Sequence, residues 1–148
     1  VPTARGGLFV TLKQGASGMI KAGTTHEAWR LAKGAPDVPS PLEHDGVLYL
    51  QGDIGNMIVV DAKTGKEHYN QRVTGERYRA SPVCADGKIF TIGRESGTVT
   101  VLRAGTKFEV LASNVLSDEG FNASPAISNG RIYVRGIRTL YAVSEGGK

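Results

Sequence analysis

The chain has 148 residues, of which 40% are hydrophobic and 22% are charged, and its formal net charge is +4. No apolar run approaches the 18 residues of a membrane-spanning helix, and the single cysteine, Cys84, excludes an intrachain disulfide. The twenty glycines and six prolines predict a globular chain rich in turns.

The dipeptide Ser-Pro recurs three times, and each proline stands five residues before a glycine that opens an apolar run. The three dipeptides are Ser40-Pro41, Ser81-Pro82 and Ser124-Pro125. A period of about 40 residues is typical of a repeat protein. The opening Val1-Pro2 fits a shorter first copy. We therefore predict one segment of four copies, approximately residues 1–39, 40–80, 81–123 and 124–148.

Each copy is predicted to contain antiparallel strands joined by tight turns. Asp-Gly or Asn-Gly separates the first two strands of copies two to four and predicts type I′ hairpins. The expected third strands are residues 19–20, 57–60, 99–102 and 140–143, and the expected fourth strands are residues 28–31, 68–73 and 108–111. Copy four ends before a fourth strand.

An aromatic residue is expected at one position of the second strand in every copy, namely Phe9, Tyr49, Phe90 and Tyr133. Stacked sheets need a large ring at such a position to fill the space between them. Four antiparallel strands in about 40 residues predict an all-β fold, a β-propeller of about four blades whose last blade is incomplete.

The turn after the third strand of copy two is the most informative local motif. Asp61 is placed to accept backbone hydrogen bonds, Thr64 adds a hydroxyl, Gly65 suits a left-handed conformation, and the ring of Tyr69 follows. This turn resembles the pyrroloquinoline-quinone (PQQ)-type propeller repeat, in which an aromatic residue stacks between blades. Trp29 is expected at the equivalent position of copy one, with Lys21 replacing the aspartate.

The resemblance implies a fold and a compartment more than a reaction. The superfamily contains quinone-dependent dehydrogenases, a scaffold lipoprotein of outer-membrane protein assembly, and many exported bacterial proteins. It therefore implies a periplasmic or secreted protein. We predict a non-catalytic scaffold for protein interaction or ligand docking, without cofactor or metal.

Two other functions stay open at this stage. Half of a quinone-dependent dehydrogenase would bind PQQ and Ca²⁺, commonly under a disulfide of adjacent cysteines. Cys84 has no partner for that disulfide, and the acidic residues are scattered singly or in pairs such as Asp118-Glu119. An anionic polysaccharide or nucleic acid would instead use Arg77 and Arg79, but the other basic residues are dispersed, so nucleic acid is not favoured.

The connections between blades are the expected binding surface, because in a propeller they cross one face toward the axis. These connections are residues 33–39, 74–80 and 114–123. Their candidate ligand-binding residues are Asp37, Arg77, Tyr78, Arg79, Asp118, Glu119, Phe121 and Asn122.

Four blades of this kind would leave open sheet edges and an uncovered blade face. The chain is therefore expected to be part of a longer propeller, to dimerise into a ring of seven or eight blades, or to close an unusually small ring. Self-association through blade faces, as a homodimer, is the expected behaviour of the isolated chain.

Overall fold

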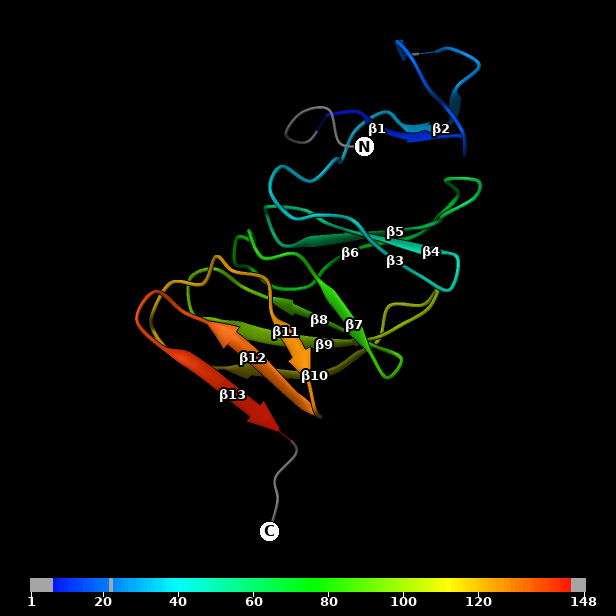
Figure 1. Cartoon of the computed structure of the whole chain (residues 1–148). Helices are drawn as coiled ribbons and strands as arrows, with labels where there is room; N and C mark the ends of the chain where they lie inside the picture. The colour runs from blue at the N-terminus through cyan, green and yellow to red at the C-terminus, as the bar shows by residue number, and fades with distance from the viewer. Residues whose placement is uncertain (1–6, 22, 145–148) are drawn as a thin grey trace.

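The computed structural model describes residues 7–21 and 23–144, which form thirteen strands in four antiparallel sheets (Figure 1). The all-β prediction is confirmed, and within these residues no helix is long and apolar enough to cross a membrane. We number the sheets as blades one to four in chain order.

Blades two and three each contain four strands that pair in sequence order, and blade four contains three. Blade two consists of β3 (Leu42–His44), β4 (Val47–Gln51), β5 (Asn56–Asp61) and β6 (Glu67–Arg72). Blade three consists of β7 (Val83–Ala85), β8 (Lys88–Ile92), β9 (Thr98–Arg103) and β10 (Val110–Val115). Blade four consists of β11 (Ala126–Ser128), β12 (Arg131–Arg135) and β13 (Leu140–Ser144). These strands follow the predicted order.

Blade one differs from the prediction. Among residues 7–21 and 23–39 it contains two strands, β1 (Phe9–Leu12) and β2 (Glu27–Leu31), and the expected strand at residues 19–20 is wrong. Met19 lies in the β1–β2 loop with 82% of its surface exposed, because two apolar residues are too few to form a buried strand. The part of copy one in residues 1–6 lies outside the described residues.

The register of β1 also corrects the alignment of copy one. Thr11 of β1 pairs with Trp29 of β2, and a bulge follows. On β5 and β6, Val59 pairs with Tyr69 and a bulge follows in the same way. Thus β1 corresponds to the third strand of the later blades, and Phe9 is not equivalent to Tyr49. Lys13, rather than Lys21, occupies the position of Asp61. Its N–H donates to the His26 carbonyl one residue before β2, as the Asp61 N–H donates to the Lys66 carbonyl one residue before β6.

The predicted type I′ hairpins are confirmed at all three Asp-Gly and Asn-Gly sites. Asp45, Asp86 and Asn129 have φ values of 51°, 49° and 50°, and the glycine after each also has positive φ. Short polar residues tolerate this left-handed region better than others. These turns lie at the opposite end of the blades from the connections that begin each new blade.

The Ser-Pro repeats join neighbouring blades where their first strands begin. The Ser40 N–H donates to Ser81 Oγ at 2.8 Å, and the Ser81 N–H donates to Ser124 Oγ at 2.9 Å. A serine hydroxyl thus links blade three to blade two and blade four to blade three, which explains why serine recurs at these positions.

Three apolar clusters fill the junctions between the four blades, one cluster per junction. At the first junction, Trp29 packs on the turn of blade two, where a Cβ on Gly65 would lie 2.5 Å from its ring. Trp29 Nε1 also donates to the Ala62 carbonyl at 2.9 Å. At the second junction, Tyr69 meets Phe108 edge to face at 5.6 Å between ring centroids. The outermost strand of one blade therefore supplies a ring to the next.

The turn that carries Gly65 has the hydrogen bonds predicted from its sequence. Asp61 Oδ1 accepts from the Thr64 N–H and from Thr64 Oγ1, both at 2.7 Å, and from the Lys63 N–H at 3.1 Å. The hydrogen bonds from Thr64 are the main reason why the pKa of Asp61 is lowered. Gly65 has a φ of 73°. The turn is thus held by local bonds while Trp29 covers it.

Burial of the second-strand aromatics is uneven. Tyr49 is fully buried, and its hydroxyl accepts from the Gly105 N–H at 2.7 Å, whereas Phe90 and Tyr133 are only half-buried. A ring at this position therefore fills the space between sheets completely only at the junction of blades two and three.

Candidate functional site

The connections between blades run between the turns of successive blades on one face, which we call the loop face. The Tyr78 N–H donates to the Asp53 carbonyl at 2.9 Å, and the Arg94 N–H donates to the Arg77 carbonyl at 2.8 Å. One blade later, the Phe121 N–H donates to the Arg94 carbonyl at 2.8 Å. These backbone bonds hold the second and third connections in register with the turns of the neighbouring blades.

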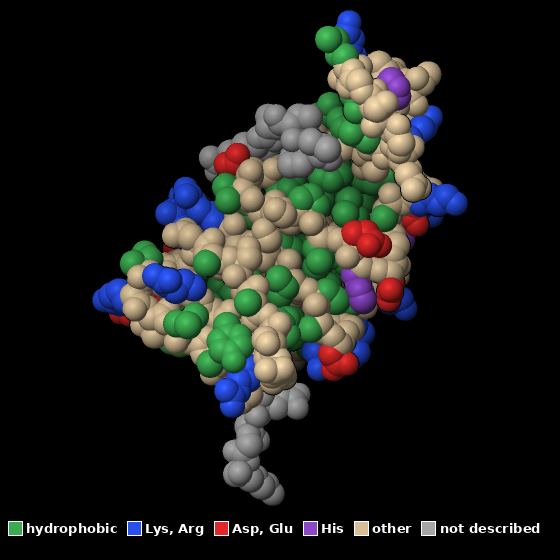
Figure 2. All heavy atoms as spheres, viewed as in Figure 1, with side chains coloured by type: hydrophobic (Ala, Val, Ile, Leu, Met, Phe, Trp, Pro, Cys, Tyr) green, Lys and Arg blue, Asp and Glu red, His purple; other side chains and the backbone are tan. Residues whose placement is uncertain are grey.

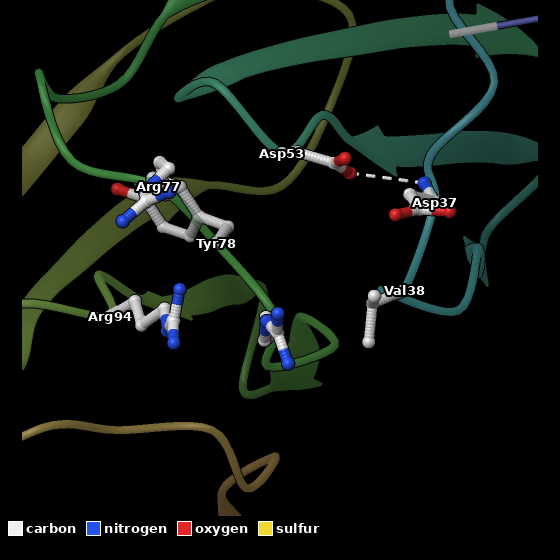
Figure 3. Close-up of a pocket in the computed structure, with 7 residues that line it drawn as sticks. Asp37, Val38, Asp53, Arg77, Tyr78 and Arg94 are labelled. Atoms are coloured by element: carbon white, nitrogen blue, oxygen red, sulfur yellow. Dashed lines mark hydrogen bonds between the residues drawn. The ribbon is translucent and has the colours of Figure 1, made fainter. Parts of the chain in front are cut away.

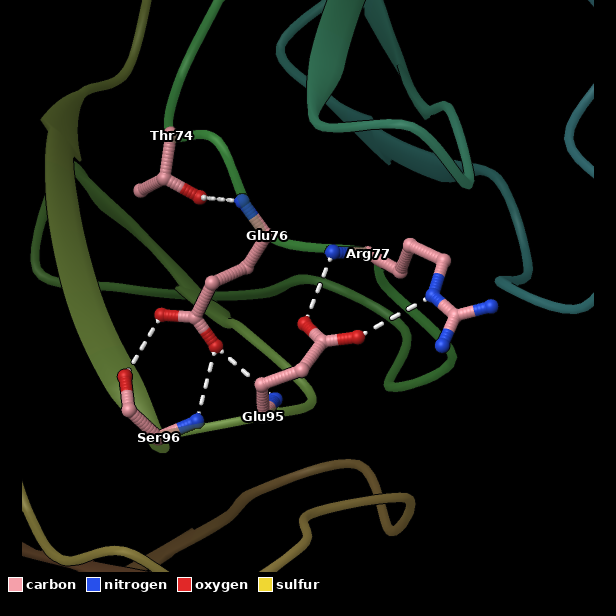
Figure 4. A network of polar contacts seen from close by, with 5 residues as sticks. All are labelled: Thr74, Glu76, Arg77, Glu95 and Ser96. Carbon is pink, nitrogen blue, oxygen red and sulfur yellow. Dashed lines mark hydrogen bonds and ion pairs between the residues drawn. The ribbon is translucent and has the colours of Figure 1, made fainter.

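A glutamate anchors each of the last two connections to the turn of the next blade. Glu76 accepts hydrogen bonds from the Glu95 N–H at 2.8 Å, the Ser96 N–H at 2.9 Å and Ser96 Oγ at 2.7 Å (Figure 4). It accepts a further one from Thr98 Oγ1. A Cβ on Gly93 would lie 2.5 Å from this carboxylate. Burial opposes the charged form, but the hydrogen bonds outweigh it and lower the pKa of Glu76.

Glu119 repeats this arrangement one blade later. Its carboxylate accepts from the Arg138 N–H at 2.6 Å and from the Tyr141 hydroxyl at 2.7 Å, and it lies against Gly136. The Arg138 N–H and the Tyr141 hydroxyl lower its pKa. Glu76 and Glu119 both stand five residues before a Ser-Pro serine. The ends of blades three and four are therefore fixed in the same way.

A small cleft of about 90 Å³ opens on the loop face where the first two connections meet the turns of blades two and three (Figure 3). We call it the loop-face cleft, and it is lined by Asp37, Val38, Asp53, Arg77, Tyr78, Arg79 and Arg94. The cleft is polar, and three guanidinium groups face two carboxylates in it.

The charges in the cleft are not all paired with each other. Arg77 Nε lies 3.0 Å from Glu95 Oε1, so this guanidinium group is already engaged. Asp53 Oδ1 accepts from the Asp37 N–H at 3.0 Å. Within residues 7–21 and 23–144, neither Arg79, which is exposed, nor Arg94, which is half-buried, forms an ion pair with an acidic side chain. The cleft therefore presents positive charge to an incoming group.

Tyr78 lies at the floor of the cleft. It is 1% exposed, and its hydroxyl is hydrogen-bonded to Thr74 Oγ1 at 2.9 Å. Burial raises the pKa of Tyr78 to about 12. The ring supports the backbone between Arg77 and Arg79 and thereby holds these two arginines in place.

The structure divides the eight predicted loop-face residues into two groups. Four of them, Asp37, Arg77, Tyr78 and Arg79, meet in the loop-face cleft. The other four, Asp118, Glu119, Phe121 and Asn122, do not line it.

Two residues of the second group are corrected from surface to interior positions. Phe121 is fully buried against Gly97 and Tyr141, and Glu119 is 5% exposed beneath the turn of blade four. Each fills space between blades because its loop is pressed onto the next sheet. Asp118 and Asn122 are exposed, and Arg138 Nη2 lies 3.8 Å from Asp118 Oδ1.

Reasoning from the sequence missed Asp53, Arg94 and Glu76. Asp53 and Arg94 occupy the same turn position in successive blades, two residues after Gln51 and Ile92 end their strands. The repeat itself could have identified Glu76, because an alignment of the copies at their Ser-Pro dipeptides superposes Glu76 on Glu119.

The alternative dehydrogenase function would require a Ca²⁺ site beside the quinone. Ca²⁺ requires six to eight oxygen ligands. Among residues 7–21 and 23–144, no group of three or more His, Cys, Asp or Glu side chains is arranged to hold a metal ion.

Sheets arranged around converging first strands, with loops threaded between the turns of successive blades, define a β-propeller segment. Residues 12–107 match the family model described as outer membrane protein assembly factor BamB, so the chain belongs to this family of PQQ-like propeller repeats. A comparison with curated proteins gives no match.

Two solved structures show the same fold. The crystal structure of BamB from Moraxella catarrhalis aligns with a TM-score of 0.74 at 15% identity, over 95% of this chain and 41% of that protein. A europium-containing methanol dehydrogenase aligns with a TM-score of 0.52 at 18% identity, over 60% of this chain and 19% of that protein. The chain thus spans less than half the length of either protein.

Proposed function

We propose that this chain is a non-catalytic docking scaffold for a protein partner, in the periplasm or outside the cell. The matching family model is that of an outer membrane protein assembly factor, which supports a role in protein interaction and an extracytoplasmic compartment. The likeness to the methanol dehydrogenase concerns the fold alone and covers 60% of the chain.

The loop-face cleft is the proposed docking surface, and the arrangement of Arg79 and Arg94 is the observation that carries this proposal. Both guanidinium groups line a cleft whose walls are fixed by backbone hydrogen bonds, and neither is paired with an acidic side chain of the described residues. A guanidinium group binds carboxylates through two parallel hydrogen bonds. The expected partner therefore offers an exposed Asp or Glu side chain to the cleft.

The test is a fluorescence-anisotropy titration with a short labelled peptide that contains Glu, beside its counterpart that contains Gln. We expect the Glu peptide to bind more tightly, and Arg79→Ala with Arg94→Ala to weaken its binding by about tenfold or more, since hydrogen bonds between charged groups contribute roughly 1.5–3 kcal/mol.

The matched control is Arg131→Ala. Arg131 is exposed and follows the Asn129-Gly130 hairpin, at the opposite end of blade four from the loop face. This variant changes charge without touching the cleft and should bind as the wild type does. An equal loss of affinity in Arg131→Ala would show a dependence on net charge alone and contradict the proposed surface.

The same assay separates a protein partner from an anionic polymer. On the face seen in Figure 2, basic side chains are dispersed among acidic ones instead of forming a continuous stripe. Nucleic-acid binding favours such a stripe. Heparin and a single-stranded oligonucleotide serve as competitors. If either binds more tightly than the Glu peptide, with a steep salt dependence, the polymer function replaces the protein function.

Two further expectations belong to this proposal. We expect no change in chain fluorescence or PQQ absorbance when PQQ and Ca²⁺ are added together, and a saturable change would support the dehydrogenase function instead. We also expect the isolated chain to self-associate through blade faces, and a monomeric mass across a dilution series in light scattering would contradict that.

A further inference from the structure

One repeat position differs sharply from blade to blade. Pairing across the last two strands aligns Thr11 with Trp29, Val59 with Tyr69, and Val101 with Ala112, and each pair lies beside a bulge. Trp29, Tyr69 and Ala112 therefore occupy the same place on the outermost strands of blades one, two and three. An aromatic ring occupies this place in the first two blades, and a methyl group in the third.

The ring has a consistent structural task at the first two junctions. Trp29 covers the turn of blade two, and Tyr69 is 8% exposed among apolar residues of blades two and three. Each ring extends from its own blade onto the next blade. Ala112 cannot reach blade four in this way.

The junction of blades three and four contains a large apolar pocket at that position. Its volume is about 570 Å³, within the range typical of ligand sites. We call it the inter-blade pocket. It is lined by Ala85, Asp86, Lys88, Phe90, Val101, Leu111, Ala112, Ile127, Gly130, Ile132, Val143 and Ser144.

Several apolar residues of the pocket reach the surface. Leu111, Ile127 and Val143 are 37%, 36% and 43% exposed, and hydrophobic side chains are visible over the fourth sheet in Figure 2. Lys88 and Asp86 form an ion pair at 3.4 Å on the lining. The pocket is therefore open to a partner and combines an apolar wall with a polar edge.

We propose that the inter-blade pocket binds an aromatic side chain supplied by a protein partner. The two equivalent junctions identify the chemistry of the occupant, because the fold places an indole ring at one and a phenol ring at the other. Aromatic side chains also carry much of the binding energy at protein interfaces. This inference rests on the proposed docking function and adds a second contact, at the opposite end of the blades from the loop-face cleft.

The test is an NMR titration of the methyl-labelled chain with two probes. One is N-acetyl-tryptophanamide, and the other is a short extended peptide with one Trp, run beside its Ala counterpart. We expect shift changes confined to methyl groups of the pocket, such as those of Leu111, Ile127 and Val143. The Trp peptide should bind at least about tenfold more tightly than the Ala peptide.

The variant that tests the position is Ala112→Trp, which supplies the ring from the chain itself. We expect it to reduce binding of the Trp peptide at least tenfold and to raise the thermal midpoint by ~3 °C or more. Ser113→Trp is the matched control, because Ser113 is exposed, lies next to Ala112 on β10 and points to the other face of the strand. It should change neither quantity. If Ala112→Trp does not fold, Ala112→Leu fills the same space with a smaller group.

Three outcomes would overturn the proposal: shift changes spread outside the pocket, equal binding by the wild type and Ala112→Trp, or a peptide that binds no better than N-acetyl-tryptophanamide. The last outcome would identify a small-molecule site instead of a protein contact. Binding of the Glu peptide at the loop-face cleft is measured separately. If the Glu peptide still binds when the Trp peptide does not, only the inter-blade pocket is rejected. If the Glu peptide does not bind either, the docking function is rejected.

Discussion

The junction of blades two and three and the junction of blades three and four are alike at the loop face and different at the other end. At the loop face, Glu76 and Glu119 hold the next turn, and the rings of Tyr78 and Phe121 lie buried two residues later. At the other end, Tyr69 fills much of the first of these junctions, where a cavity of about 230 Å³ remains, and Ala112 leaves about 570 Å³ at the second. The repeat thus preserves polar anchors while the apolar filling varies.

The largest effect is expected from making the closed junction resemble the open one. Tyr69→Ala should lower the free energy of unfolding by about 3 kcal/mol, because a buried ring that contacts both blades is removed and a cavity remains. Urea unfolding at equilibrium measures this change. Tyr69→Phe is the control, since the Tyr69 hydroxyl has no hydrogen-bond partner in the described part of the chain. A loss of similar size in Tyr69→Phe would mean that the hydroxyl, not the ring, stabilises the junction.

The junction of blades one and two extends the comparison to Trp29, the other ring at this repeat position. Gly65→Ala should cost about 2–3 kcal/mol, because the new Cβ would lie 2.5 Å from Trp29 on a backbone with a φ of 73°. Gly46→Ala is matched to it, with a φ of 74° and open space around the new Cβ. It should cost about 1 kcal/mol for the backbone alone. Equal losses in urea unfolding would show that Trp29 is not packed on this turn.

The smallest expected effect on stability comes from the loop face, where both junctions have the same glutamate anchor. Hydrogen bonds lower the pKa of Glu76 below its ordinary value of 4.5. A lowered pKa in the folded state stabilises the fold above the unfolded value, and this contribution is lost as the pH falls through the folded value. Glu76→Gln should therefore cost about 1 kcal/mol near pH 7 and less as the pH falls towards 3.

Unfolding curves of the wild type and Glu76→Gln across this pH range provide the measurement. Glu119→Gln should change the pH dependence with the same sign, since the pKa of Glu119 is lowered too. A difference between the wild type and Glu76→Gln that is independent of pH would contradict the assignment of this carboxylate as an ionised anchor.

The sequence predicted the blades well where each strand carries its own local signal. Asp-Gly and Asn-Gly turns and the Ser-Pro period locate the first strands of blades two to four, because these are properties of neighbouring residues. Copy one was misaligned by one strand, since Phe9 resembles Tyr49 in type while its register matches β5. Only pairing with Trp29 determines that register, and pairing is not a local property.

The candidate site was predicted in part, because contacts that are not local in the sequence also bring its residues together. The connections were identified from topology, and four of their residues line the cleft. Glu119 and Phe121 are instead buried between blades three and four, and no pattern in the loops specifies which side of a connection faces the next sheet. Asp53 and Arg94 belong to turns that looked purely structural, and hydrogen bonds to the connections bring them to the cleft.

The serine contacts between blades have a direction. In both, the earlier blade donates a backbone N–H and the later blade accepts with a hydroxyl, so Ser81 accepts on one side and donates on the other. A head-to-tail contact of this kind is heterologous, and it generates either a closed ring or an open array according to the rotation between units. Tandem duplication of a repeat would preserve the bond on both sides, so the number of blades can change during evolution without new chemistry at the axis.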